Sequence, residues 1–226
     1  MKRIGCIFIF LFLAIQSDPS LAFHDGGVAE CAGCHTMHNS QDGALVDPDS
    51  PLGNPWLLND ATPSDVCLNC HATRLGSVFA TDVLNPAPLK GAGNFIFLLE
   101  DNLNDGHGGA TSPISGDAAG HNLDAPGHGL APDATLTTSP GGNFNASVMG
   151  CTSCHDPHGT DDFRMLYGSG RLVNQYFTFT NAAPTAEGLS LHFGAESNTS
   201  HTAYQSGMSA WCGNCHGDFH DNTLSD

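Results

Sequence analysis

The chain has 226 residues, of which 6 are Lys or Arg and 23 are Asp or Glu, giving a formal net charge of −17 at pH 7. So acidic a chain excludes nucleic acid as a partner, because binding to phosphates depends on many cationic side chains. The charge favours cationic partners or metal ions, although an excess of one sign also simply keeps a protein soluble.

The amino terminus is typical of a signal peptide covering residues 1–22. Two basic side chains are followed by an apolar stretch at residues 4–15, and residues 20–22 place small side chains at the positions that signal peptidase reads. The apolar stretch is too short to span a bilayer. We therefore expect cleavage before Phe23, an exported domain at residues 23–226, and no membrane span in that mature chain.

The 9 cysteines follow a strict pattern. Cys6 lies at the beginning of the apolar stretch, whereas a lipid-anchored cysteine would follow it, so Cys6 leaves with the signal peptide. The others fall in four Cys-x-x-Cys-His motifs of one length. These are Cys31-Ala-Gly-Cys34-His35, Cys67-Leu-Asn-Cys70-His71, Cys151-Thr-Ser-Cys154-His155 and Cys212-Gly-Asn-Cys215-His216.

Cys-x-x-Cys-His is the attachment motif of c-type haem. Its two thiols reach the two vinyl groups on one edge of the porphyrin, and the imidazole of the next residue lies beneath the iron as the proximal ligand. Zinc ribbons and a disulfide framework are the alternatives, but neither requires His after the second cysteine in four motifs. The sequence predicts four covalently attached haems c, with His35, His71, His155 and His216 as proximal ligands.

Gly, Pro, Asn, Asp, Ser and Thr dominate long stretches of the chain, notably residues 101–140, and no helical periodicity is longer than about three turns. Apolar residues are nevertheless too frequent for a disordered chain. We therefore expect a multihaem cytochrome c fold, mostly loop, with a few short helices beside the motifs, minimal strand, and a core built on the haems. Residues 95–99 and 176–180 are candidate short strands, or extended segments lying against a haem.

The sixth coordination position decides what each haem does, because a filled position favours electron transfer and an open one binds substrate. Three motifs continue into another His after a short gap, namely His38, His158 and His220. Each lies too close to its own proximal His to reach the far face of the same haem. We therefore expect each to ligate a neighbouring haem.

If each trailing His serves the preceding haem, His158 ligates the second haem and His220 the third. The first haem then needs a distant donor, for which we choose His121. This leaves the fourth haem without a second ligand and His38 without a haem in its own chain, a pair of vacancies that a neighbouring subunit would satisfy. Histidines kept in reserve are His24, His128 and His201, while His107 and His192 are expected in loops.

Methionine is the alternative sixth ligand, and it raises the potential of the iron. The candidates are Met37, Met149, Met165 and Met208. Because histidine is in excess, we expect bis-His iron of low potential, which lacks the methionine-to-iron charge-transfer band. Four macrocycles inside a domain of this size are expected to be neighbours, giving a continuous electron path.

Several blocks carry a family resemblance: residues 23–40 with His35-Thr-Met-His38, residues 120–122, residues 135–142, residues 151–159 and residues 207–212. They resemble the extracellular multihaem cytochromes of metal-reducing bacteria that polymerise into filaments, in particular the tetrahaem members. The resemblance implies a stacked haem chain that continues across subunits, bis-His ligation, and His38 donated to a haem of the adjacent protomer.

The leading functional hypothesis is a secreted homopolymer at the cell surface that carries electrons to redox partner proteins or to external acceptors such as metal oxides, without a catalytic residue. The alternative is a monomeric periplasmic electron shuttle, whose fourth haem would use His201 or His24. A haem reductase acting on a small oxyanion would need basic residues around an open iron. Residues 23–226 contain only four Lys or Arg, which argues against that third class.

Overall fold

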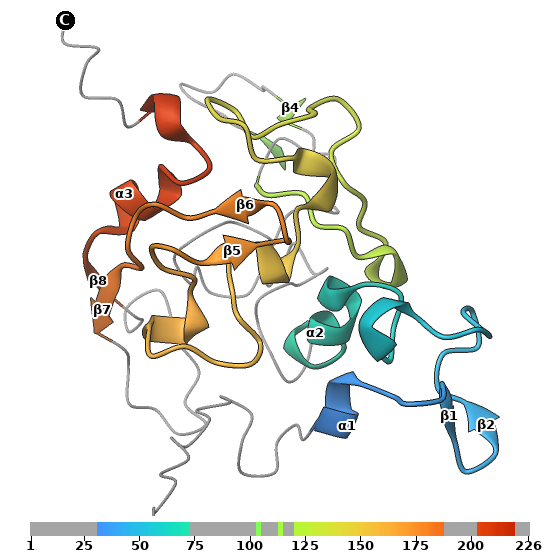
Figure 1. Cartoon of the computed structure of the whole chain (residues 1–226). Coiled ribbons are helices and arrows are strands. Elements are labelled where there is room, and N and C mark those ends of the chain that lie inside the picture. The colour runs from blue at the N-terminus through green and yellow to red at the C-terminus, as the bar shows by residue number, and fades with distance from the viewer. Residues whose placement is uncertain (1–30, 73–102, 105–112, 115–119, 188–202, 220–226) are drawn as a thin grey trace, which may run out of the picture.

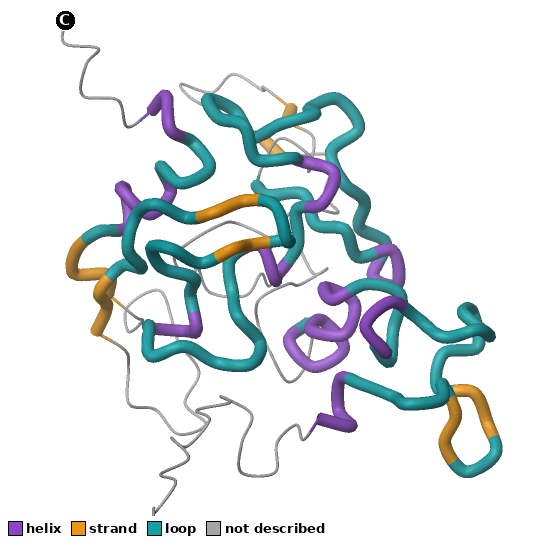
Figure 2. The backbone as a smooth tube through the Cα atoms, viewed as in Figure 1, coloured by secondary structure: helices purple, strands orange, loops and turns teal. Residues whose placement is uncertain are grey.

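The computed structural model describes residues 31–72, 103–104, 113–114, 120–187 and 203–219. The expected signal peptide and the candidate strand at residues 95–99 lie outside these ranges. Within them, loops connect short helices and two-stranded sheets, as Figures 1 and 2 show. No helix in this part of the chain combines the length and apolar character needed to cross a membrane.

Short helical segments accompany all four motifs, as the sequence predicts. The first, second and fourth motifs lie on or after α1 (Cys31–Cys34), α2 (Pro63–His71) and α3 (Met208–Cys212), and the third begins at the 3-10 helix η6 (Cys151–Ser153). The other 3-10 helices in the described ranges are η1 (Pro55–Leu57), η4 (Pro126–His128), η5 (Ala146–Val148), η7 (Phe163–Met165) and η8 (Gly217–Phe219).

The strands form four separate antiparallel pairs. They are β1 (Ser40–Gln41) with β2 (Ala44–Leu45), β3 (Leu103–Asn104) with β4 (Pro113–Ile114), β5 (Leu172–Val173) with β6 (Phe177–Thr178), and β7 (Thr185–Glu187) with β8 (Ala203–Ser206). The β6 strand confirms the candidate strand at residues 176–180. In its register, Leu172 lies opposite Thr178 and Val173 opposite Phe177.

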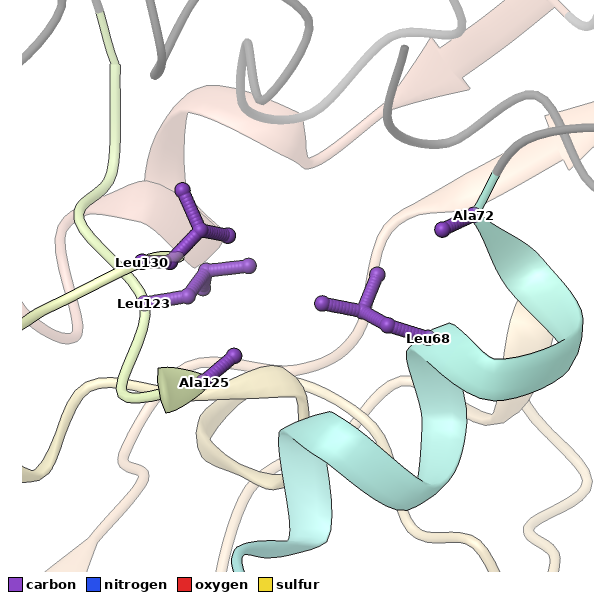
Figure 3. Close-up of a cluster of buried hydrophobic side chains, with 5 residues drawn as sticks. All are labelled: Leu68, Ala72, Leu123, Ala125 and Leu130. Atoms are coloured by element: carbon purple, nitrogen blue, oxygen red, sulfur yellow. The ribbon is translucent and has the colours of Figure 1, made fainter. Parts of the chain in front are cut away.

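Two small apolar clusters lie directly beside the motifs. The first joins α2 to a loop segment and includes Leu68, Ala72, Leu123, Ala125 and Leu130, with Cys151 packed against it. Figure 3 shows Leu68 and Ala72 on α2 facing the other three side chains. The second cluster contains Phe144, Leu166, Val173, Phe179 and Trp211, with Cys154 and Cys215 packed against it. The protein core is therefore built around the cysteines.

Helix α2 begins with a well-defined cap. The Thr62 hydroxyl accepts a hydrogen bond from the Asp65 backbone N–H at 3.1 Å, and Pro63 occupies the first turn, where its missing N–H costs nothing. The buried Asp65 carboxylate also accepts a hydrogen bond from the Gly127 N–H at 2.9 Å. This cap fixes where the second motif starts and ties the loop after residue 124 to the helix.

We expect Thr62→Ala to lower the free energy of unfolding by about 1 kcal/mol, because the substitution removes the cap of α2. Chemical denaturation of the holoprotein, followed by circular dichroism, measures this loss. The matched control is Thr178→Ala on the exposed face of β6, which should change stability by less than about 0.5 kcal/mol. Equal losses for the two variants would show that the cap contributes little.

Candidate haem sites

None of the cysteines of the four motifs is in a disulfide, and neighbouring motifs come close to one another through them. Hydrogen bonding with Cys151 raises the pKa of Cys67, so the second and third motifs meet at their first cysteines. Burial, followed by the nearby Cys70, raises the pKa of Cys34. Burial, followed by Cys215, raises the pKa of Cys154 to about 12. The four motifs thus form one continuous group.

These raised pKa values bear on what the thiols can bind. Zinc is bound by thiolates, and burial disfavours that charged form. A thioether to a haem vinyl group carries no charge, so its burial avoids the penalty. The buried surroundings of Cys154 therefore suit a thioether bond to haem better than a zinc thiolate centre.

Three motif imidazoles are held by backbone carbonyl groups. His35 Nδ1 lies 3.0 Å from the Trp56 oxygen, His155 Nδ1 lies 2.8 Å from the Arg164 oxygen, and His216 Nδ1 lies 2.6 Å from the Pro140 oxygen. A carbonyl can only accept, so Nδ1 carries the proton and Nε2 keeps its lone pair. Histidines that ligate a metal are usually held in this way by an outer partner.

Two of these carbonyls are placed by the same unusual turn. Trp56 and Leu57 in η1 have φ values of 54° and 59°, and Arg164 and Met165 in η7 have φ values of 54° and 56°. After each turn the chain bridges back to the motif, pairing Leu58 with His35 and Leu166 with His155. The first and third motifs are therefore structural repeats, although their return segments differ in length.

Burial also favours the neutral form of two imidazoles, which is the form that ligates a metal. It lowers the pKa of His155, although the hydrogen bond to the Arg164 carbonyl opposes the shift. Burial, followed by the nearby His216, lowers the pKa of His121. A neutral imidazole has a free lone pair at Nε2, as ligation requires.

Two pairs of imidazole rings face each other across a fixed gap. The His35 and His158 ring centroids are 6.3 Å apart with planes inclined by 10°, and the His121 and His216 centroids are 6.1 Å apart with planes inclined by 40°. Two metal–nitrogen bonds of about 2 Å, plus ~1.1 Å from each nitrogen to its ring centroid, span about 6 Å. Each gap therefore has the size of one bis-His iron site.

These pairs differ from the expected ones. His158, expected at the second haem, lies opposite His35 of the first motif, and His121, expected at the first haem, lies opposite His216 of the fourth. A bond from the Cys151 N–H to the Ser64 hydroxyl, 3.1 Å long, fixes the third motif on α2. Packing between distant segments, rather than motif order, decides which rings meet.

The remaining histidines fall into four cases. His38 is exposed, and the described residues place no imidazole ring opposite it. His128 lies beside the buried Asp65, with its Nδ1 3.3 Å from a carboxylate oxygen. His71 ends α2 and is exposed. The candidates outside the described ranges are His24, His107, His192, His201 and His220.

The side chains around the motifs fit a large, flat, mostly apolar group. Beside the first motif, Met37 is 74% exposed, Trp56 is 62% exposed and Leu57 is 48% exposed. Asn122 is buried, yet neither of its amide atoms has a hydrogen-bond partner, and the Asn59 Oδ1 atom is in the same condition. A macrocycle with polar groups at its edge would cover the apolar side chains and offer partners to the amides.

Comparison with known proteins agrees with this geometry. The family described as the doubled CXXCH motif matches residues 24–75 and 145–174, which contain the two structural repeats. The fold and the sites therefore define a multihaem c-type cytochrome.

The chain is 33% identical over 260 residues to the C-type cytochrome OmcS of Geobacter sulfurreducens, an alignment that covers 92% of this chain and 60% of OmcS. Its fold resembles two OmcS structures. The cryo-EM structure of OmcS nanowires matches with a TM-score of 0.66 and 31% identity, over 87% of this chain and 60% of that one. The outer membrane cytochrome S filament matches with a TM-score of 0.63 and 30% identity, over 86% and 60%.

The chain belongs to the multihaem c-type cytochromes related to OmcS. It spans about 60% of the length of that relative. The core of loops and short helices around the motifs confirms the fold class expected from the sequence.

Proposed function

We propose that the protein is an extracellular electron conductor that binds four haems c and assembles into a filament. The observation that carries the proposal is the pair of facing imidazoles at His35 and His158, and at His121 and His216. Haem supplies the exchange of one electron at its iron. A second imidazole keeps substrate away from that iron, so the site passes electrons without chemical change.

The chain's own residues position the haems and hold the iron ligands. The motif cysteines tether each macrocycle, and the carbonyls of Trp56, Arg164 and Pro140 orient three proximal imidazoles. Because the cysteines of consecutive motifs adjoin one another, the haems tethered to them are close neighbours. Electrons can therefore move from motif to motif inside one subunit.

Assembly follows from His38. This side chain is exposed and stands three residues after His35, as His158 stands three residues after His155. His158 faces a proximal imidazole of another motif in its own chain. By the same arrangement, His38 would ligate a haem of the adjacent subunit and join the two haem chains. The relatives solved as filaments support this assembly. The external acceptor would be a metal oxide or a redox partner protein.

We expect His38→Ala to abolish polymerisation while leaving four haems attached to the monomer, because the substitution removes a ligand and none of the tethering cysteines. Electron microscopy of the secreted holoprotein measures filament length, and intact mass counts the haems. Thr178→Ala, on the exposed face of β6, is the control, because it removes no imidazole. Filaments of normal length from the His38 variant would contradict the proposal. A wild-type protein that stays at monomer mass at all concentrations would instead be a periplasmic shuttle.

A further inference from the structure

Asn122 carries a buried primary amide without any partner. The residue is 8% exposed, and neither Nδ2 nor Oδ1 forms a hydrogen bond with protein. Nearly all buried side-chain polar atoms in native proteins are paired, so an orphaned amide indicates a partner that is not part of the polypeptide. Asn122 differs in this respect from Asn181, whose amide donates to the Ala210 carbonyl at 2.7 Å.

The segment that carries Asn122 runs among three haem motifs. Its neighbour His121 faces His216 of the fourth motif. On its other side, Leu123 packs against Leu68 of α2, which holds the second motif (Figure 3). The next residue, Asp124, donates its backbone N–H to the Met149 carbonyl, two residues before the third motif. The backbone on both sides of Asn122 is therefore held against segments that carry haem motifs.

The chemistry of haem c narrows the choice of partner. The macrocycle is apolar except for two propionate groups at one edge, and these are carboxylates that need donors. The chain has 6 Lys and Arg in all, against 23 Asp and Glu, so cationic side chains are too few to serve every propionate. A primary amide offers two N–H donors without adding charge. Asn122 has both donors free.

We propose that Asn122 donates its amide N–H groups to a propionate of a haem beside His121, and so positions that haem and raises its reduction potential. The inference rests on the proposed attachment of haem. Reduction adds an electron to a group that the ionised propionate already makes negative. An N–H donor offsets part of that negative charge and favours the reduced state. Without the donor, the midpoint potential of that haem falls.

Asn122→Leu tests the proposal, because leucine has nearly the shape of asparagine and no donor. We expect one haem midpoint to fall in a potentiometric titration of the holoprotein, while the others stay unchanged. The expected size is up to about tenfold in the ratio of reduced to oxidised haem, or about 59 mV for a one-electron couple. The propionate bending bands of the resonance Raman spectrum should shift in the same variant.

Asn181→Leu is the matched control: it removes an amide whose partner is protein, so it should lower the melting temperature without moving a midpoint or a propionate band. Asn122→Ser keeps one O–H donor, and should give an intermediate midpoint even if the leucine variant fails to fold. Unchanged midpoints and Raman bands in a folded Asn122 variant would overturn the proposal and assign the amide to a buried water. Haem count and filament formation, measured on the same variants, test the proposed function separately.

Discussion

Replacing His158 by alanine is expected to convert one haem per subunit from low-spin to high-spin iron and to let the reduced protein bind carbon monoxide. The reason is that His158 faces the proximal His35 across 6.3 Å, with nearly parallel ring planes, so its loss leaves that iron with a single imidazole. Optical and electron paramagnetic resonance spectra of the holoprotein measure the spin state, and a carbon monoxide titration counts the open sites. A fully low-spin variant would contradict the pairing.

A second variant identifies which haem His158 serves. The double substitution Cys31→Ala and Cys34→Ala removes both attachment cysteines of the first motif and so eliminates its haem. In that background, His158→Ala should add no high-spin signal, since the affected iron is already gone. If His158 instead serves the second haem, the high-spin signal will persist. Thr178→Ala should stay fully low-spin, because it removes no imidazole.

Gly142→Ala is expected to lower the free energy of unfolding by about 3 kcal/mol or more, because a Cβ at this position would overlap the carbonyl group of Cys215. The turn at residues 139–142 is hydrogen-bonded to the fourth motif and the residues that follow it. The Pro140 carbonyl holds His216, the Ser139 hydroxyl donates to the Cys215 carbonyl, and the Gly141 carbonyl accepts from the Asp218 N–H at 2.8 Å. The nearest atoms belong to the backbone of Cys215, so they cannot move aside as the end of a flexible side chain could.

The thermal unfolding of Gly142→Ala should therefore begin well below that of the natural protein, and part of the fourth haem should become high-spin as His216 loses its anchor. Gly217→Ala provides the matched control. It lies next to the same histidine, but a Cβ there would meet nothing within 4 Å. If both variants unfold at the same temperature, the close approach at Gly142 does not determine the stability of this site.

Local features of the fold were predictable from short stretches of sequence. The motif spacing indicated haem attachment, and helical turns do lie at Cys31–Cys34, Pro63–His71, Cys151–Ser153 and Met208–Cys212. The strand at Phe177–Thr178 lies within the segment expected at residues 176–180. Each of these depends on neighbours along the chain, because a helical turn or a strand is set by residues a few positions apart.

No pattern in the sequence predicted which carbonyl groups hold the proximal imidazoles. Trp56 and Arg164 adopt positive φ values that the residue types Trp and Arg do not indicate. Each turn is followed by a bridge back to the motif, at His35 and at His155. The orphaned amide of Asn122 was equally hidden, since burial depends on segments that pack over it.

The sequence by itself determined that this is a multihaem c-type cytochrome, because thioether attachment and proximal ligation need only five consecutive residues. The order of motifs led to the expectation that His158 serves the second haem and His121 the first. Only the tertiary structure placed these rings opposite His35 and His216. The physical reason is that the second ligand must approach the iron from the face opposite the proximal histidine. Which histidine reaches that face depends on how α2, the third motif and the turn at residues 139–142 pack together.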